Sequence, residues 1–316
     1  MVNFSSDCML VFGVVQMIVC GVSASASGSQ YSQGSKPWIP SSIPPSLSYT
    51  NLTSKLDEIL ARGYLKVGTT GDYKPFTYLV TNTFSLPTTT TNPNTNTTTT
   101  IAINTTYIGA DISAAQSLSN ALGLPHPVQF IPTAWANLTT DLSASKFDIA
   151  MSGVSLTLPR ARSAFFSTPI QRVGKTGCIR CSDAEKFTSL ATIDRGGVRV
   201  VVNPGGSNQA FDVANLKKAT IVLVQDNNAV YQAVLDGTAD AMISDLIEVQ
   251  LQVRLHPGRL CVVNPEEPWN FEELGYMMGR DGVWKGFVDQ WVRVMVGSGG
   301  WDETLGMWMD YKWPTV

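Results

Sequence analysis

The 316-residue sequence is poor in the residues on which metal sites and nucleic-acid interfaces depend. It contains two histidines, His126 and His256, and its formal net charge is −3, with 15% charged residues. With only these two histidines the chain offers few partners for zinc, and a slightly acidic chain offers no basic surface to nucleic acid. A site for an anion must therefore be local, built from a few arginines and backbone N–H groups.

Long apolar runs are also scarce. One stretch, CMLVFGVVQMIVCGV at residues 8–22, is followed by the small residues SASAS. This pattern predicts a secretory signal peptide over residues 1–26, cleaved after Ala26, although no Lys or Arg precedes the apolar run. A membrane anchor is the alternative, but the run is short for a span. No later stretch is long and apolar enough to cross a membrane, so we expect a secreted protein without a span once the signal is removed.

Cysteine is rare outside the predicted signal. Cys8 and Cys20 leave with the signal, and Cys178, Cys181 and Cys261 remain. In an exported protein, three cysteines are most simply one disulfide and one free thiol. The Cys178-Ile-Arg-Cys181 spacing is also compatible with a redox pair or half of a zinc site, but the chain offers few partners for zinc.

Two segments have a composition that cannot build a core. Residues 27–50 are rich in Ser, Pro and Gly, which predicts a flexible leader, and residues 83–106 form a Thr- and Asn-rich tract. We expect this tract to be a loop inserted between two strands, with no part in the chemistry. Four sequons outside the signal support a secretory route and are the expected glycosylation sites: Asn51, Asn96, Asn104 and Asn137.

Elsewhere the sequence alternates between strand and helix patterns. With 44% hydrophobic residues, a chain of this length can bury the cores of two domains. The expected strands are 65–70, 128–132, 147–151, 198–202, 221–224, 241–244 and 261–263, and the expected helices are 52–61, 110–122, 136–144, 209–216, 228–236, 284–296 and 301–309. This alternation predicts mainly parallel sheets, with ligands bound at the carboxyl ends of the strands.

The stretch FDIAMSGVSLTLPRARSAFFSTP, residues 147–169, is the first candidate for such a site. An apolar strand runs into the small residues Ser152 to Ser155 and then into a helix start that carries Arg160. Unpaired backbone N–H groups beside a guanidinium form a site for a carboxylate. The alternative is a surface turn with a solvated arginine.

A second strand ends in the Gly-rich turn NPGGSN, residues 203–208, directly before a predicted helix. The turn predicts a second anion site, because it again presents backbone N–H groups at a helix start. It lacks the Lys and the spacing of a P-loop, so we do not expect nucleotide binding.

Taken in order, these motifs resemble a known family. The segments LKVGTTGDYKPF, GADISAA, FDIAMSGVSLTLPRARSAFFSTP and ADAMISD resemble the polar amino-acid binding proteins, which have the type II periplasmic solute-binding fold. A further set is similar to one enzymatic branch, the cyclohexadienyl (prephenate or arogenate) dehydratases: TTGDYKPF, GKTG at 174–177, NPGGSN, NLKKA at 215–219, HPGRLCVV at 256–263, VDQW at 288–291 and YKWP at 311–314. The resemblance covers residue 52 to the end, apart from the Thr-rich tract.

The resemblance implies an α/β fold of two lobes joined by two crossing hinge strands, with the ligand in the cleft. Lobe one would comprise residues 50–172 and 269–316, and lobe two residues 173–268. The family has cysteines matching Cys181 and Cys261, which implies a disulfide between them and leaves Cys178 as an additional thiol.

The resemblance also implies roles for residues of the cleft. In the binding proteins, the residue matching Arg160 clamps the ligand carboxylate, and the acid matching Asp245 holds an ammonium. The Ser207-Asn208 turn approaches from the other lobe. Tyr73 and Trp135 are expected to form walls of the cleft, and Phe76 is either a wall or a core residue. The remaining expected substrate-binding residues are Asp72, Tyr73, Trp135, Ser152, Gly153, Ser155 and Lys175.

A dehydratase needs a proton donor in addition to this clamp. Glu248 lies three residues beyond Asp245, where the dehydratase branch has Glu and simple binding proteins commonly have an apolar residue. A carboxylic acid kept neutral by burial is sufficient to protonate a leaving hydroxyl, and Lys175 is placed to neutralise a second carboxylate. The alternatives are a first-turn glutamate favoured by the helix dipole and a hinge lysine in solvent.

The resemblance therefore implies a secreted carbon–oxygen lyase that converts prephenate to phenylpyruvate, or L-arogenate to L-phenylalanine, without a metal or organic cofactor. The alternatives are a non-catalytic binder of a small amino or carboxylic acid, and a glycosylated surface domain with a degenerate cleft. One departure bears on the site: Gln209 follows the NPGGSN turn, where the branch usually has Glu.

Overall fold

The computed structural model describes residues 54–86 and 100–314. The predicted signal peptide at 1–26, the leader at 27–50 and the sequons at Asn51 and Asn96 lie outside the described residues. Within the described part of the chain, no helix is long and apolar enough to cross a membrane.

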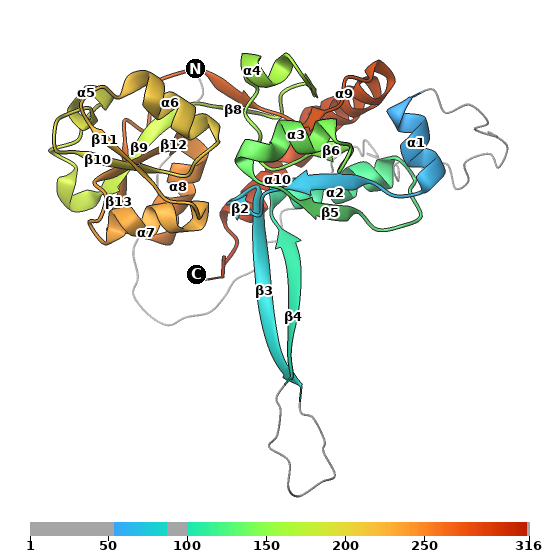
Figure 1. Ribbon diagram of the computed structural model, residues 1–316, viewed down its shortest axis with the longest axis horizontal. Helices are drawn as coiled ribbons and strands as arrows, with labels where there is room; N and C mark the ends of the chain where they lie inside the picture. The colour runs from blue at the N-terminus through green and yellow to red at the C-terminus, as the bar shows by residue number, and fades with distance from the viewer. Residues whose placement is uncertain (1–53, 87–99, 315–316) are drawn as a thin grey trace, which may run out of the picture. The chain divides into compact units, whose positions relative to one another are not determined.

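Lobe one is built on a five-stranded sheet with the order β5-β1-β6-β15-β7. Two of these strands, β5 and β6, are labelled in Figure 1. Its strands are β1 (Lys66–Thr69), β5 (Gln129–Pro132), β6 (Ile149–Ala150), β7 (Phe165–Phe166) and β15 (Met277–Met278). Strand β1 is parallel to β5 and β6, whereas β15 is antiparallel to β6 and β7. Its helices are α1 (Lys55–Arg62), α2 (Ala110–Ala121), η1 (Trp135–Asn137), α3 (Leu138–Ser143), α4 (Leu158–Ala161), α9 (Gly282–Gly297) and α10 (Gly300–Met309).

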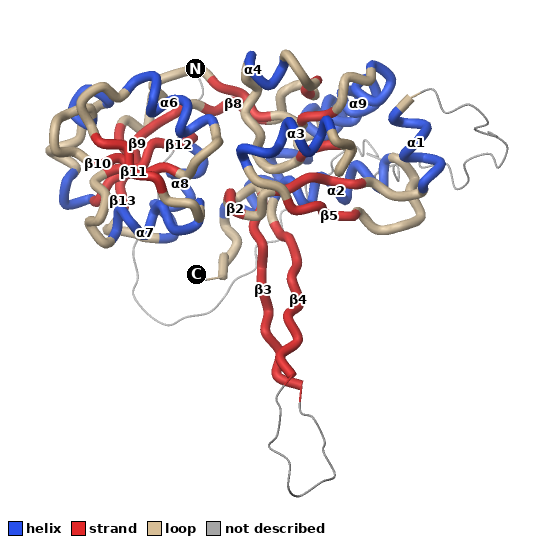
Figure 2. The backbone as a smooth tube through the Cα atoms, in the orientation of Figure 1, coloured by secondary structure: helices blue, strands red, loops and turns tan. Residues whose placement is uncertain are grey.

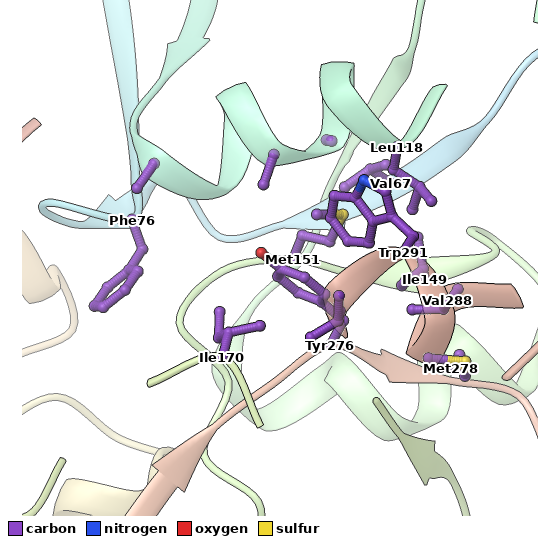
Figure 3. Close-up of a cluster of buried hydrophobic side chains, with 14 of the residues drawn as sticks. Val67, Phe76, Leu118, Ile149, Met151, Ile170, Tyr276, Met278, Val288 and Trp291 are labelled. Carbon is purple, nitrogen blue, oxygen red and sulfur yellow. The ribbon is translucent and has the colours of Figure 1, made fainter. Parts of the chain in front are cut away.

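The core of lobe one brings the C-terminal helices onto this sheet. Trp291 and Val288 of α9 pack in one buried cluster with Val67 of β1, Ile149 of β6 and Leu118 of α2 (Figure 3). Fully burying a side chain of this size contributes about 1.5–3 kcal/mol, so the C-terminal segment is held to lobe one by hydrophobic contacts. The predicted amphipathic helices at 284–296 and 301–309 are confirmed as core elements.

Lobe two is built on a second five-stranded sheet with the order β11-β10-β12-β9-β13. Its strands are β9 (Lys175–Arg180), β10 (Arg199–Val202), β11 (Thr220–Leu223), β12 (Ala241–Asp245) and β13 (Leu260–Val263). Strand β10 is parallel to β11 and β12, and β9 is antiparallel to β12 and β13. Its helices are η2 (Cys181–Asp183), α5 (Leu190–Ile193), α6 (Ser207–Asn215), η3 (Asn227–Ala229), α7 (Val230–Leu235) and α8 (Leu246–Leu255).

The disulfide joins Cys181 to Cys261, as the resemblance implied, and it closes a separation of 80 residues. It connects the end of β9 to β13, the neighbouring edge strand. Cys178 is a buried free thiol on β9, and burial raises its pKa. The thiol is therefore kept out of solvent and protonated.

Two short antiparallel strands, β8 (Gln171–Val173) and β14 (Glu272–Leu274), cross between the lobes. This hinge and the two sheets confirm the predicted two-lobed α/β fold. The expectation of mainly parallel sheets is wrong, because each five-stranded sheet has two parallel and two antiparallel pairs among its described strands. The sequence pattern missed β9, the antiparallel strand inside the lobe-two sheet. Its residues Lys175 to Cys178 are all buried, so the strand has no alternation of polar and apolar residues that could reveal it.

The Thr- and Asn-rich tract was expected to be a loop over residues 83–106, and this expectation is wrong at both ends. Strand β3 (Thr77–Leu86) pairs with β4 (Thr100–Ile108) as an antiparallel arm, drawn in red in Figure 2. Threonine is β-branched and favours extended backbone, so a Thr-rich composition is compatible with strands. The arm begins beside β2 (Asp72–Tyr73), which pairs with the first residues of β3.

Candidate functional site

The site begins where β1 and β6 end side by side. The Ser152 hydroxyl accepts a hydrogen bond from the Thr70 N–H at 2.9 Å and lies 2.9 Å from the Thr70 hydroxyl. Ser152 is fully buried. It therefore fastens two strand ends together, and its hydroxyl is already engaged within the protein.

Gly153 allows Tyr73 to approach this turn. Its φ is +64°, and a Cβ added here would lie 2.5 Å from the Tyr73 ring. Its N–H donates to the Asp111 carboxylate at 2.6 Å. The turn therefore orders the cleft by positioning Tyr73, while the Gly153 N–H is already engaged with Asp111.

Arg160 lies on α4, and its guanidinium donates to the Ser155 carbonyl at 3.1 Å. Burial lowers its pKa, and the nearby Glu272 acts in the opposite direction. Among the described residues, no carboxylate lies within ion-pair distance (4.0 Å) of Arg160. Arg160 thus remains a largely buried cation whose remaining donors can hold a carboxylate, whereas Arg162 is exposed.

The Gly-rich turn of lobe two faces this clamp. The Ser207 hydroxyl lies 3.0 Å from the Ser155 hydroxyl, and Asn208 donates to Ser244 at 2.9 Å. Gln209 accepts a hydrogen bond from the Gly205 N–H at 2.7 Å. Gln209 therefore supports the turn, but it also occupies one of the N–H groups that the sequence suggested for an anion.

Lys175 is fully buried at the centre of a charged cluster. Its ammonium lies 2.8 Å from Asp245, 3.2 Å from Glu272 and 3.2 Å from the Ser207 hydroxyl. Burial by itself would lower the pKa of Lys175, but the two carboxylates raise it above its ordinary value. Lys175 is therefore a permanent cation inside the protein and not a solvated hinge lysine.

Tyr73 and Trp135 line the cleft from lobe one. The Tyr73 hydroxyl donates to the Asp245 carboxylate across the cleft, and the Trp135 ring stands edge-on to Tyr73 at 5.6 Å. The Trp135 indole N–H donates to Asp72 at 3.0 Å, and burial is the main cause of the raised pKa of Asp72. Phe76 is fully buried and stacks on Trp301, so it belongs to the core.

Glu248 lies in the first turn of α8 and is buried. Burial raises its pKa to about 8, and the charge of Asp245 acts in the same direction. The hydrogen bond that the Ser244 hydroxyl donates to Glu248 partly opposes this shift. The Glu248 carboxyl group is therefore mainly protonated at neutral pH. It lies one helical turn from Asp245, which forms an ion pair with Lys175.

Two cavities adjoin these residues. A small one of about 20 Å³ lies in the cleft between Tyr73, Trp135 and Ser155 of lobe one and Ser207, Asn208 and Asp245 of lobe two. A larger one of about 430 Å³ is lined by Glu248, Tyr231 and Asp72, and Asn227 lines both. The cleft is closed, because contacts between the lobes fill most of it.

The structure thus assembles most of the expected residues, from segments more than 170 positions apart. Glu272, Asn227 and Tyr231 were not anticipated. Glu272 lies on the hinge strand β14, and no local pattern in the sequence links it to Lys175, 97 positions earlier. Asn227 donates to the Asp72 carbonyl at 2.9 Å, so it is a further contact between the lobes.

Comparison with known proteins places this chain in a family. Residues 88–309 match the family model described as bacterial extracellular solute-binding proteins, family 3. The chain is 43% identical over 263 residues to the cyclohexadienyl dehydratase of Pseudomonas aeruginosa, an alignment that covers 83% of this chain and 89% of the relative. It is 22% identical over 225 residues to the L-cystine-binding protein TcyJ of Escherichia coli, covering 71% and 74% of the two chains.

Among solved structures, the chain is similar to an ancestral amino acid-binding protein described as a precursor of cyclohexadienyl dehydratase. The two share 30% sequence identity with a TM-score of 0.67, over 81% of this chain and all of the other. The extent of the family match, the two-lobed fold and the identity to a curated relative agree with one another. The chain therefore belongs to the bacterial extracellular solute-binding proteins of family 3.

Proposed function

We propose that the protein is a carbon–oxygen lyase that catalyses the decarboxylating dehydration of prephenate to phenylpyruvate, of L-arogenate to L-phenylalanine, or of both. The observation that carries this proposal is Glu248, a buried carboxylic acid with a pKa of about 8 next to a cluster that holds charges. A simple binding protein has no use for such a proton donor. The 43% identity to a cyclohexadienyl dehydratase supports the same reaction.

The reaction requires one proton and firm positioning. Glu248 gives its proton to the ring hydroxyl, the carbon–oxygen bond breaks, and water leaves. The electron pair of the bond between the ring and its carboxylate moves into the ring, carbon dioxide departs, and the ring becomes aromatic. Glu248 is left as a carboxylate and regains a proton from water before the next turnover, a general-acid role.

The cations of the cleft hold the substrate for this step. Arg160 binds one carboxylate with its free donors. Lys175 already pairs with Asp245 and Glu272, so it can bind a second carboxylate only in exchange for one of them. Tyr73, Trp135 and Asp72 form one wall, and Ser155, Ser207 and Asn208 supply hydroxyl and amide groups from both lobes. Because the cleft is closed to about 20 Å³, the lobes must separate to admit a substrate of this size.

Turnover with both substrates tests this function. Purified protein should form phenylpyruvate from prephenate or L-phenylalanine from L-arogenate. Glu248→Gln, which keeps the shape but not the acid, should lower kcat by about 10²–10⁴-fold. Glu185→Gln, a change at an exposed glutamate of lobe two, is the matched control and should leave kcat unchanged. A wild-type protein that is inactive but stabilised by an amino acid would be a solute-binding protein instead.

The solute-binding alternative rests on one observation, which is that the Arg160 clamp and the Gly-rich turn serve binding as well as catalysis. Thermal unfolding with the common amino acids distinguishes it, because a ligand that binds the native state raises Tm. A protein with neither turnover nor such stabilisation would have a degenerate cleft.

We also propose that the chain is secreted through residues 1–26 and carries glycans on its sequons. The family of extracellular proteins and the disulfide support export. Asn137 is exposed at the start of α3 and can accept a glycan, and Asn104 lies on β4 of the arm. N-terminal sequencing and peptide mass mapping of the protein from a secreting eukaryotic host test both points.

A further inference from the structure

The buried serine Ser244 connects the Gly-rich turn of lobe two to Glu248. Ser244 lies on β12, directly before α8, and is fully buried. Its hydroxyl oxygen accepts a hydrogen bond from the side-chain amide of Asn208 at 2.9 Å, and its hydroxyl donates to Oε2 of Glu248. The three side chains therefore form one chain of hydrogen bonds that runs from α6 through β12 to α8.

This chain fixes where the hydroxyl hydrogen of Ser244 lies. A serine hydroxyl has one hydrogen to donate and lone pairs with which to accept. Because Asn208 supplies an N–H, the hydrogen of Ser244 goes to Glu248, the acceptor that the hydroxyl reaches among the described residues. In a neutral carboxylic acid the oxygen that accepts in this way is the carbonyl oxygen. The acid proton of Glu248 is therefore on the other oxygen, Oε1.

Oε1 is the carboxyl oxygen of Glu248 that the protein leaves free. Within residues 54–86 and 100–314, no side chain or backbone group forms a hydrogen bond with it. Since Oε1 is not one of the fully enclosed polar atoms without a partner in this part of the chain, it stays open to the cavity of about 430 Å³ that Glu248 lines. A proton on Oε1 can therefore reach a bound molecule, whereas a proton on Oε2 would be turned toward Ser244.

The other groups around Glu248 act on it through charge and burial. Burial is the main cause of its raised pKa, Asp245 acts in the same direction, and Lys175 acts in the opposite one. These two charged groups pair with each other at 2.8 Å. Three further groups that face the carboxyl group are neutral near pH 7, because burial raises the pKa of each: Tyr73, Tyr231 and Cys178. The Ser244 hydroxyl is thus the direct contact through which the protein favours the carboxylate form of Glu248.

We propose that Ser244 is a positioning residue for the dehydration, holding Oε2 of Glu248 so that Oε1, on the cavity side, carries the transferable proton; this role rests on the proposed function. As the proton passes from Oε1 to the ring hydroxyl, the carbon–oxygen bond breaks and water leaves. Glu248 becomes a carboxylate that still accepts from Ser244. A hydrogen bond to a charged group is stronger than one to a neutral group, so Ser244 stabilises the state after proton transfer more than the state before it.

Ser244→Ala tests this role, because it removes the donor and leaves Glu248 in place. Without the donor the carboxylate is less favoured, so the pKa of Glu248 should rise and the alkaline fall in kcat should move to higher pH. On the plateau at lower pH, kcat should be about tenfold or more below wild type, with KM within about twofold. Ser244→Thr keeps the hydroxyl and should retain the wild-type midpoint.

Thr176→Val is the matched control. Thr176 lies opposite Ser244 in the pairing of β9 with β12 and is equally buried, but its hydroxyl donates to the Val263 carbonyl. Both Thr176→Val and Ser244→Ala should lower Tm, since each leaves a buried group without its partner. Only Ser244→Ala should shift the midpoint of kcat. Equal losses of kcat in the two variants, with the same midpoint, would reduce Ser244 to a structural residue.

Infrared difference titration of wild type against Glu248→Gln follows the acid without turnover. The C=O band of protonated Glu248 should disappear with the midpoint seen in kcat, and in Ser244→Ala the band should lie at higher frequency and persist to higher pH. A midpoint that moved to lower pH would mean that Glu248 donates to Ser244, and an unchanged band and midpoint would mean that the bond is absent. Either result overturns the proposal.

The two measurements separate this proposal from the reaction on which it rests. An inactive wild type whose infrared midpoint shifts in Ser244→Ala would refute the reaction and, with it, the catalytic use of the bond, while the placement of the proton on Oε1 would stand. An active wild type whose midpoint is the same in Ser244→Ala would keep the reaction and refute the role of Ser244.

Discussion

The Tyr73 hydroxyl donates to the Asp245 carboxylate, and this hydrogen bond joins lobe one to lobe two across the closed cleft. Asp245 also pairs with Lys175 at 2.8 Å. The carboxylate that the resemblance assigned to a ligand ammonium is therefore already bound to a cation and a hydroxyl of the protein. A ligand that enters must compete with both.

The hydroxyl of Tyr73 should stabilise the closed protein. Tyr73→Phe keeps the ring packed on Gly153 but leaves a buried carboxylate with one donor fewer, so we expect the free energy of unfolding in urea to fall by about 1.5–3 kcal/mol. Tyr64→Phe, which removes a hydroxyl from a half-buried residue that follows α1, is the control. Equal stability of wild type and Tyr73→Phe would mean that this bond contributes nothing in solution.

The rate of the proposed reaction should depend on the ionisation of Glu248. The acid acts only when protonated, and its pKa is about 8. The kcat of wild type should therefore be constant below pH 7 and fall tenfold per unit at high pH, with a midpoint near 8. The residual rate of Glu248→Gln should show no such fall. A wild-type rate that increased between pH 7 and 9 would exclude Glu248 as the general acid.

Stability should also decline toward alkaline pH. Burial raises the pKa of Glu248 and of Asp212 to about 8, and that of Asp111 to about 7. The native state then holds protons that the unfolded chain releases near pH 4, so these groups stabilise the fold fully below pH 4. Their contribution is lost as pH rises to about 8. Urea unfolding from pH 4 to 9 measures this trend.

Single variants show which buried carboxyl groups cause the loss of stability toward alkaline pH. Asp212 has two buried carboxyl oxygens without a hydrogen-bond partner among the described residues, so Asp212→Asn should flatten the decline. Asp289→Asn, at a half-buried carboxylate that accepts from Thr168 and Lys285, is the comparison and should not flatten it. A decline that stays the same in Asp212→Asn and Glu248→Gln would refute the assignment.

Loss of the disulfide should weaken lobe two. Replacing both Cys181 and Cys261 by Ser removes a link between residues 80 positions apart, and we expect the free energy of unfolding to fall by about 2–4 kcal/mol. Because both cysteines lie in lobe two, away from the hinge, the rate of the surviving folded protein should be unchanged. Replacing the buried Cys178 by Ala is the control, and it should leave the disulfide formed.

Much of the fold could be predicted from the sequence. The parallel strands β1, β5, β10 and β11 follow helices or Gly-rich turns with clear patterns, and all were expected within one or two residues. Strand β9 could not be predicted in this way, because a strand buried on both faces shows no alternation. The arm was missed because the composition of a Thr-rich tract was weighed above the β propensity of threonine.

Less of the candidate site than of the fold could be predicted from the sequence. The Arg160 clamp and the acid at 248 were found from local motifs and a resemblance. The pairing of Lys175 with Glu272 and the position of Asn227 between the lobes depend on contacts between distant segments. Burial, which raises the pKa of Glu248 and makes it a proton donor, is likewise a property of the folded chain.

The arm of β3 and β4 is attached to the very turn that lines both cavities. Strand β2 carries Asp72 and Tyr73 and pairs directly with the base of β3, and Lys74 follows in the same turn. Because β2, β3 and β4 pair side by side, the backbone of the cleft wall at Asp72 and Tyr73 is held by the same ladder of hydrogen bonds that builds the arm. The Thr-rich tract thus contributes to the framework of the site, although none of its described residues lines either cavity.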